Sequence, residues 1–333
     1  MREFNELISS IENGNYSPFY LLSGVEPYFI DQIELTIKDQ LVDEESESFD
    51  YSLFYGKEVE STQIVEAAKR FPMISRYHLV IVREAQHLDK SIDVIADYLS
   101  SPQLNTVLVI CYKYKKFDKR KKLYKAAKKT GVFFDSKPLF DSQLAPWISA
   151  KLKASNFSTD NTGLQLLVEA LGNDLNKIEK EIDKLKIVLT KGTIISPEII
   201  EAHIGFSKDY NNFELYKSLG KRDFNKCCQI VKYMSENPKN HPLTLTISGL
   251  HTFFRRVLTY QVIIDKSEAA SILGVNPYFL RDYEQAALFF DIEQATKAIS
   301  LTLEADLKSK GVGVKSGNHK FILQDLIVKV FAI

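Results

Sequence analysis

Phe19-Tyr20-Leu21-Leu22-Ser23-Gly24-Val25-Glu26-Pro27 is the stretch that decides the fold. A short apolar run, a glycine turn and a helical pattern from Tyr28 form the strand-turn-helix context of a phosphate-binding loop. A working loop would continue with Gly-Lys-Ser or Gly-Lys-Thr, which supply a phosphate-facing lysine and a magnesium-facing hydroxyl. Neither residue follows Gly24 here. The sequence therefore predicts the scaffold of a nucleotide site without its chemistry.

A second segment also has the scaffold of a nucleotide site without its chemistry. The buried-type strand His78–Val82 runs into Arg83-Glu84-Ala85, where a P-loop ATPase would carry Asp-Glu-Ala. Magnesium is held by oxygen ligands, and an arginine side chain has none to offer. We therefore expect a chain with the fold of an ATPase and no ATPase chemistry of its own.

Around these two segments, short strand-like runs alternate with helical stretches up to about residue 140. This alternation predicts a parallel sheet wound with helices, and thus an α/β domain over residues 1–140. The expected strands are Phe19–Leu22, Asp50–Phe54, His78–Val82, Thr106–Cys111 and Gly131–Asp135, with helices that include Tyr28–Leu41 and Ile64–Arg70.

The strand pattern almost stops after this point. A leucine and isoleucine stripe over residues 164–189, interrupted by Gly172-Asn173-Asp174, predicts two helices within a small helical domain, residues 141–207. A third domain, residues 208–333, also reads as helical. Its periodic stretches lie near residues 212–235, 243–265, 277–289, 292–308 and 319–332.

Composition limits the classes of function. The 333 residues carry 43 Lys and Arg against 43 Asp and Glu, which excludes a globally basic nucleic-acid coat but allows a local basic patch. The three cysteines, Cys111, Cys227 and Cys228, lack metal-site spacing and fit a reducing cytoplasm. We expect no membrane contact, because no apolar run approaches the roughly 18 residues of a transmembrane helix.

Several motifs in register resemble the delta subunits of the bacterial DNA polymerase III clamp loader. Phe19–Gly24 with Glu26-Pro27-Tyr28 is similar to the opening strand and turn of that family. Similar motifs follow in order along almost the whole chain: Phe71–Arg76 before Leu79–Val82, Phe117–Tyr124, Gly172–Leu175 with Ile178–Leu185, Pro277–Leu280, and Glu304–Lys308.

This resemblance implies a degenerate AAA+ domain, a lid at residues 141–207 and a collar at residues 208–333. It implies that the chain binds and opens the sliding clamp (beta subunit) for loading on primed DNA, without hydrolysing ATP. The expected partners are the gamma/tau ATPase subunits and delta-prime in a hetero-pentamer. The chain would be a non-catalytic part of a DNA-directed DNA polymerase, a nucleotidyltransferase.

The resemblance also concerns the lid, which in AAA+ proteins usually carries Gly-x-x-Arg with an arginine that senses the nucleotide. Here Gly172 is followed at that offset by Leu175, which cannot sense a phosphate.

The apolar run Phe71-Pro72-Met73-Ile74 lies where a polar turn is expected. The residues alone favour a loop that folds back into the core. The resemblance instead implies a hydrophobic plug that enters a pocket on the clamp.

The segment from Lys113 to Lys129 carries ten basic residues and one acid, Asp118. It is typical either of a solvated helix face or of a surface that contacts DNA phosphates. The candidates for DNA contact are Lys119, Arg120, Lys121, Lys122 and, from the glycine-rich loop at residues 311–317, Lys315.

No catalytic residue, metal ligand or cofactor is predicted. The six histidines are scattered, and no glycine context suits a nucleophilic serine. Two alternatives to the clamp-loader hypothesis stay open: a divergent AAA+ ATPase, and a stand-alone DNA-binding module.

Overall fold

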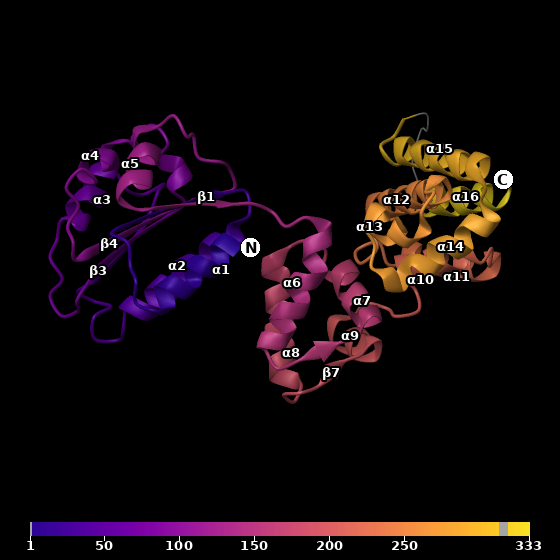
Figure 1. Ribbon diagram of the computed structural model, residues 1–333, viewed down its shortest axis with the longest axis horizontal. Helices are drawn as coiled ribbons and strands as arrows, with labels where there is room; N and C mark the ends of the chain where they lie inside the picture. Colours follow the sequence, from indigo (N-terminus) through magenta and orange to yellow (C-terminus); the bar gives the residue numbers. More distant parts are fainter. Residues whose placement is uncertain (1, 313–318) are drawn as a thin grey trace. The chain divides into compact units, whose positions relative to one another are not determined.

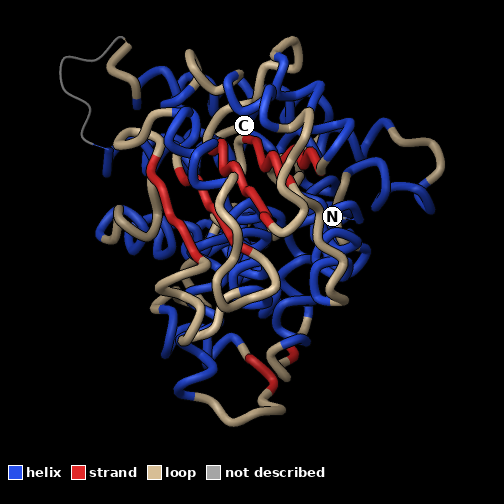
Figure 2. The backbone as a smooth tube through the Cα atoms, turned by 90° about the vertical axis from the view of Figure 1, so that its left-hand side faces the viewer, coloured by secondary structure: helices blue, strands red, loops and turns tan. Residues whose placement is uncertain are grey.

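The computed structural model describes residues 2–312 and 319–333, and it divides into two units, Met1–Pro138 and Leu139–Ile333. Unit 1 is built on a parallel sheet (Figures 1 and 2). Its strand order is β2-β3-β4-β1-β5. The strands are β1 (Phe19–Gly24), β2 (Tyr51–Tyr55), β3 (His78–Arg83), β4 (Thr106–Lys113) and β5 (Val132–Ser136). All five predicted strands are confirmed, each to within two residues.

Helices cover both faces of this sheet (Figure 1). Successive strand residues point to opposite faces, so Phe19 and Leu21 pack on one layer of helices and Tyr20 and Leu22 face the other. The first layer is α3 (Ser61–Ala68), α4 (Val94–Tyr98) and α5 (Lys122–Thr130), and the second is α1 (Arg2–Glu12) and α2 (Pro27–Leu41). The predicted α/β class is confirmed.

Unit 2 is almost entirely helical, with one two-stranded pair, β6 (Ser158–Thr159) and β7 (Ile194–Ile195). The predicted break in the leucine stripe is confirmed, because Gly172 ends one helix and Asp174 caps the next by accepting a hydrogen bond from the Lys177 amide. The helices are α6 (Asp141–Ala154), α7 (Asn161–Leu171), α8 (Leu175–Val188), α9 (Pro197–Ile204), α10 (Asn212–Gly220), α11 (Phe224–Glu236), α12 (Leu243–Val262), α13 (Ala269–Leu273), α14 (Leu280–Phe289), α15 (Ile292–Ser309) and α16 (His319–Phe331).

The periodic stretch predicted near residues 212–235 is divided into two helices, α10 and α11. Arg222 takes a left-handed conformation (φ 55°), which ends the first helix. Asp223 then caps the second by accepting from the Lys226 amide. The Arg222 side chain compensates for its strained backbone by donating to the carbonyls of Phe331 and Ile333 at the end of the chain.

In the described ranges, no helix combines the length and apolar character that a membrane span requires.

Candidate functional site

The loop between α3 and β3 carries apolar side chains into solvent. Phe71 is 74% exposed, Met73 75% and Ile74 55%, while Pro72 is partly buried. The interpretation based on the residues alone, that this run folds into the core, is wrong. Exposed apolar side chains that gather on one surface mark sites of interaction.

One buried carboxylate holds this loop. Asp50, which directly precedes β2 and is 2% exposed, accepts hydrogen bonds from three consecutive backbone amides. Its Oδ1 accepts from Met73 N at 2.5 Å, and its Oδ2 accepts from Ile74 N at 2.8 Å and Ser75 N at 2.5 Å. Asp50 therefore fixes the backbone of residues 73–75, while the apolar side chains of the loop stay exposed.

The charge of Asp50 is stabilised by these contacts. Burial raises the pKa of the carboxyl group, but the amides of Ser75, Met73 and Ile74, with a smaller contribution from His78, outweigh burial and leave the pKa below its ordinary value. Since the pKa is lowered, the carboxylate persists at neutral pH, and its stabilising effect is lost only as the pH falls through that lowered pKa. The sequence did not reveal Asp50, because its partners lie 23 to 25 residues further along the chain.

Two other exposed apolar side chains belong to the same edge of the sheet. Phe49, before β2, is 55% exposed, and Leu104, before β4, is 80% exposed. Because β2, β3 and β4 are neighbours and parallel, their amino ends meet at one edge. Loop 71–74 precedes β3 and so belongs to this edge as well.

The opposite, carboxyl edge is where open α/β sheets bind ligands. Gly24, the first of the three predicted remnants of a nucleotide site, lies there. Only Val25 and Glu26 separate β1 from α2. Val25 N donates to the Ser136 carbonyl at 3.1 Å. A Cβ atom at Gly24 (φ 152°) would lie 1.9 Å from that carbonyl oxygen, so only glycine fits. This backbone is thus tied to β5.

The amino end of α2 is capped by the chain itself. The Glu26 carboxylate accepts from the Tyr28 amide at 3.0 Å, and Pro27 begins the helix without an N–H group. A helix amino end binds anions through such N–H groups and its dipole. A carboxylate of the chain therefore stands where a nucleotide phosphate would lie.

Arg83, the second remnant, forms an ion pair at the end of β3. Its Nε donates to Glu34 Oε1 at 2.7 Å and its Nη2 lies 2.6 Å from the same oxygen. The Glu34 side chain, on α2, is 4% exposed, and the Cys111 thiol donates to its Oε2 at 3.3 Å. Hydrogen bonding to Glu34 raises the pKa of Arg83 despite partial burial. Arg83 thus supplies positive charge to a buried carboxylate.

Leu175, the third remnant, lies in unit 2. It is the first residue of α8, and its side chain is 1% exposed. Here the leucine has a packing role, and a buried hydrocarbon offers no group for a phosphate.

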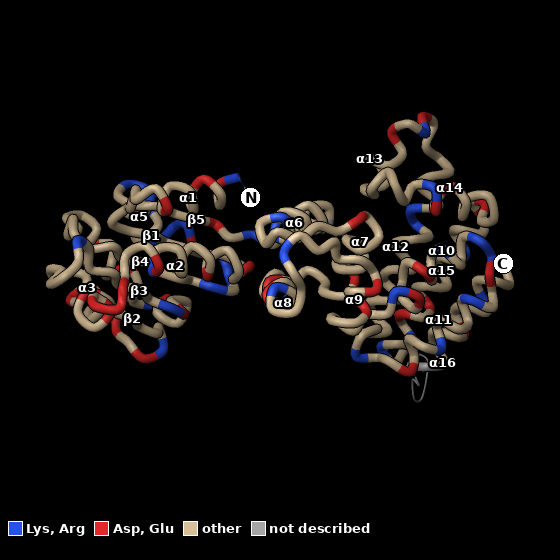
Figure 3. The backbone as a smooth tube through the Cα atoms, turned by 90° about the horizontal axis from the view of Figure 1, so that it is seen from below, with Lys and Arg blue, Asp and Glu red and all other residues tan. Residues whose placement is uncertain are grey.

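The predicted DNA-contact residues differ in their surroundings. Arg120 pairs with Asp118 at 2.9 Å, and Lys121 bonds to Asp89. Lys119 and Lys122 are exposed and no ion pair involves them among the described residues. Lys315 lies outside the described residues. Figure 3 shows basic and acidic segments interspersed along both units.

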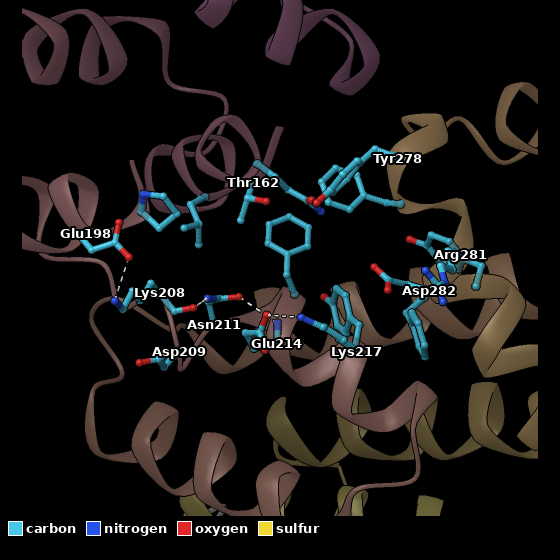
Figure 4. A pocket seen from close by; sticks show the side chains of 18 residues that line it. Thr162, Glu198, Lys208, Asp209, Asn211, Glu214, Lys217, Tyr278, Arg281 and Asp282 are labelled. Atoms are coloured by element: carbon cyan, nitrogen blue, oxygen red, sulfur yellow. Dashed lines mark hydrogen bonds and ion pairs between the residues drawn. The ribbon is translucent and has the colours of Figure 1, made fainter. Parts of the chain in front are cut away.

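A pocket of about 700 Å³ in unit 2 has a mixed lining of aromatic and charged side chains (Figure 4). Two ion pairs lie in this lining: Lys208 with Glu198 at 3.0 Å, and Lys217 with Glu214 at 3.4 Å. Across the described ranges, no group of acidic, His and Cys side chains is arranged to hold a metal ion.

Beside this pocket, Glu169 of α7 is a buried carboxyl group whose Oε1 accepts from the Asn212 amide at 2.6 Å. Burial raises its pKa to about 7, although the amides of Asn212 and Phe213 oppose the shift. The unfolded chain ionises near pH 4.5, so the protonated form contributes stability that is lost between pH 4.5 and 7. Because of this group, we expect the free energy of unfolding of unit 2 to be roughly 2 kcal/mol lower at pH 8 than at pH 5.

Glu169→Gln is expected to flatten this pH dependence, as measured by urea unfolding at pH 5 and pH 8. Glu179→Gln, which alters a partly exposed carboxylate that pairs with Lys151, is the control. Equal pH dependence in Glu169→Gln and the unaltered chain would contradict this assignment.

Comparison with known proteins shows what the chain is similar to. The family model described as "DNA polymerase III, delta subunit" matches residues 20–137, which cover the sheet, the exposed loop and the first two nucleotide-site remnants. Over these residues the α/β unit is similar to the DNA polymerase III delta subunit family. The chain is also similar to DNA polymerase III subunit delta of Bacillus subtilis (strain 168), with 26% identity over 299 residues and 85% coverage of both chains.

A solved structure shows the same fold over the whole length. The Bacillus subtilis DNA clamp loader delta protein (YqeN) superimposes with a TM-score of 0.55 at 23% identity, covering 99% of this chain and 100% of that one. The fold therefore resembles that of this clamp-loader delta protein: a parallel sheet domain followed by helical domains.

Proposed function

We propose that this chain is the subunit of a DNA polymerase III clamp loader that binds and opens the sliding clamp. The observation that carries the proposal is the exposed apolar loop of Phe71, Met73 and Ile74 on a delta-family domain, with its backbone held by Asp50. Apolar side chains that leave water on binding provide the affinity of interface hot spots. The loop would enter an apolar pocket of the beta subunit.

The chain would do this without hydrolysing ATP. Glu26 occupies the amino end of α2, and Arg83 is bound to Glu34. No lysine follows Gly24 that would face a phosphate. Energy would come from the gamma/tau subunits, joined with this chain and delta-prime in a hetero-pentamer in the bacterial cytoplasm.

In this scheme residues 141–207 serve as the lid and residues 208–333 as the collar that joins the subunits. Nucleotide binding by the neighbours exposes loop 71–74 to the clamp. The loop docks, the ring opens, and hydrolysis on primed DNA releases it. The contribution of this chain is mechanical: it supplies a docking surface on a rigid sheet.

The test is direct binding of the full chain to an immobilised bacterial beta sliding clamp. We expect saturable binding that a soluble clamp competes away. Absence of binding, both by the chain alone and in the presence of ATP-loaded gamma/tau and delta-prime, would overturn the proposal.

We further propose that Lys119 and Lys122 contact DNA phosphates within the assembled loader, since both are exposed cations on the basic segment. Lys119→Glu with Lys122→Glu is expected to weaken binding of primed DNA by the loader and to reduce the slope of log K against log salt by about 2. Lys57→Glu with Lys137→Glu, both in unit 1, is the control. An unchanged salt slope would contradict the assignment.

A further inference from the structure

The loop that carries Met73 and Ile74 has more hydrogen-bonded backbone amides than its exposed apolar composition predicts. Exposed turns usually leave their backbone amides to water, but here the amides of Met73, Ile74 and Ser75 converge on Asp50. Successive N–H groups that point into one concavity form a nest that binds an anion. The anion in this nest is a side chain of the chain itself.

Asp50 is itself fixed in place. Its own amide donates to the Ser46 carbonyl at 2.8 Å, and its carbonyl accepts from Leu79 N of β3 at 2.8 Å. The carboxylate is thus anchored to the two strands at whose edge the loop emerges. The loop is therefore held from the sheet, while its side chains stay in solvent.

We propose that Asp50 is the positioning residue of the docking loop, and that it pre-orders residues 71–75 in the free chain for the clamp. The inference rests on the proposed function. A loop ordered before binding loses less conformational freedom when it docks, which raises its affinity. Asp50 itself, being buried, would not touch the clamp.

Asp50→Asn is the sharpest variant because it keeps the size of the side chain. Both carboxylate oxygens accept in the native loop, one from Met73 N and the other from Ile74 N and Ser75 N. Asparagine has one acceptor oxygen, so its amide nitrogen would face a backbone N–H group, donor against donor. The nest loses at least one of its bonds, whichever way the side chain turns.

Asp43→Asn is the matched control. Asp43 lies in the same segment before β2, and its carboxylate accepts from the Ser46 amide at 2.8 Å and from the Ser46 hydroxyl at 2.7 Å. The described contacts of its side chain lie within its own turn. It therefore controls for loss of a carboxylate in this segment.

The first measurement is amide hydrogen exchange in the free full-length chain, resolved over residues 71–77. In the unaltered chain we expect slow exchange at Met73, Ile74 and Ser75 despite their exposed setting. Asp50→Asn should accelerate this exchange at least tenfold, and Asp43→Asn should leave it unchanged. Fast exchange of all three amides in the unaltered chain would overturn the proposal even if the variant failed to fold.

The second measurement is affinity for the immobilised beta clamp. Asp50→Asn should lower the urea midpoint, because the lost hydrogen bonds also stabilise the fold. Without urea, where the variant is still folded, it should weaken binding about tenfold, and Asp50→Glu, which keeps the carboxylate, should recover part of the loss. Accelerated exchange with unchanged clamp affinity would overturn the positioning role. Failure of the unaltered chain to bind any clamp would instead overturn the proposed function, while the exchange result would still decide whether Asp50 orders the loop.

Discussion

Met73→Ala combined with Ile74→Ala is expected to weaken binding of the chain to the beta sliding clamp by about 100-fold, or ~2.7 kcal/mol. The two side chains are 75% and 55% exposed in the free chain, so they have most of their apolar surface left to bury. Full burial of such a side chain contributes about 1.5 to 3 kcal/mol. The cost of ordering the loop is small because its backbone already bonds to Asp50.

Titration against immobilised clamp measures this effect, and each single variant shows which side chain is the anchor. Leu35→Ala with Val94→Ala is the matched control, since these residues are 51% and 42% exposed on α2 and α4 of the same unit. The free energy of unfolding should stay within about 0.5 kcal/mol in both double variants, because surface changes of this kind cost little. A plug variant that binds within about twofold of the unaltered chain would remove loop 71–74 from the interface.

The sheet could be predicted from the sequence because each strand is an apolar run bounded by turns. The break between α7 and α8 was predictable for a similar reason, since Gly172 and Asp174 are strong end signals. The break between α10 and α11 was missed although Asp223 is an N-cap signal like Asp174, because the left-handed residue at this break is an arginine and not a glycine. Arg222 takes that conformation where its side chain reaches the carbonyls of Phe331 and Ile333, more than a hundred residues away.

The candidate site also contains residues that the sequence predicts and residues that it does not. The family resemblance pointed to Phe71–Ile74, but whether those side chains are exposed depends on Asp50, and contacts between distant amides and one carboxylate have no sequence motif. The absence of nucleotide chemistry stays a prediction, which the sequence makes from Arg83. The partner of Arg83, Glu34, was not predicted, because α2 meets β3 only in the folded sheet.

Arg83→Asp restores the acidic residue of an ATPase strand end, yet we expect it to destabilise unit 1 by about 3 kcal/mol and to confer no ATP binding. Glu34 has a side chain 4% exposed, and Arg83 supplies its paired cation through two contacts below 3 Å. Removing one partner of a buried pair leaves an uncompensated charge. Aspartate would add a second negative charge beside it, although the 38% exposure of the Arg83 side chain moderates the cost.

Urea unfolding at neutral pH measures the loss, and titration with labelled ATP and magnesium tests binding. Arg83→Met, which removes the cation without adding an anion, should cost less than Arg83→Asp. Arg83→Met with Glu34→Gln should recover much of its stability, because the buried charge is then gone as well. If Arg83→Asp were as stable as Arg83→Met, repulsion by Glu34 would be refuted. If Arg83→Asp bound ATP, neither the Glu26 cap nor the missing lysine would be enough to prevent nucleotide binding at the carboxyl edge of the sheet. Arg83 alone would then account for the expected lack of ATP binding by the unaltered chain.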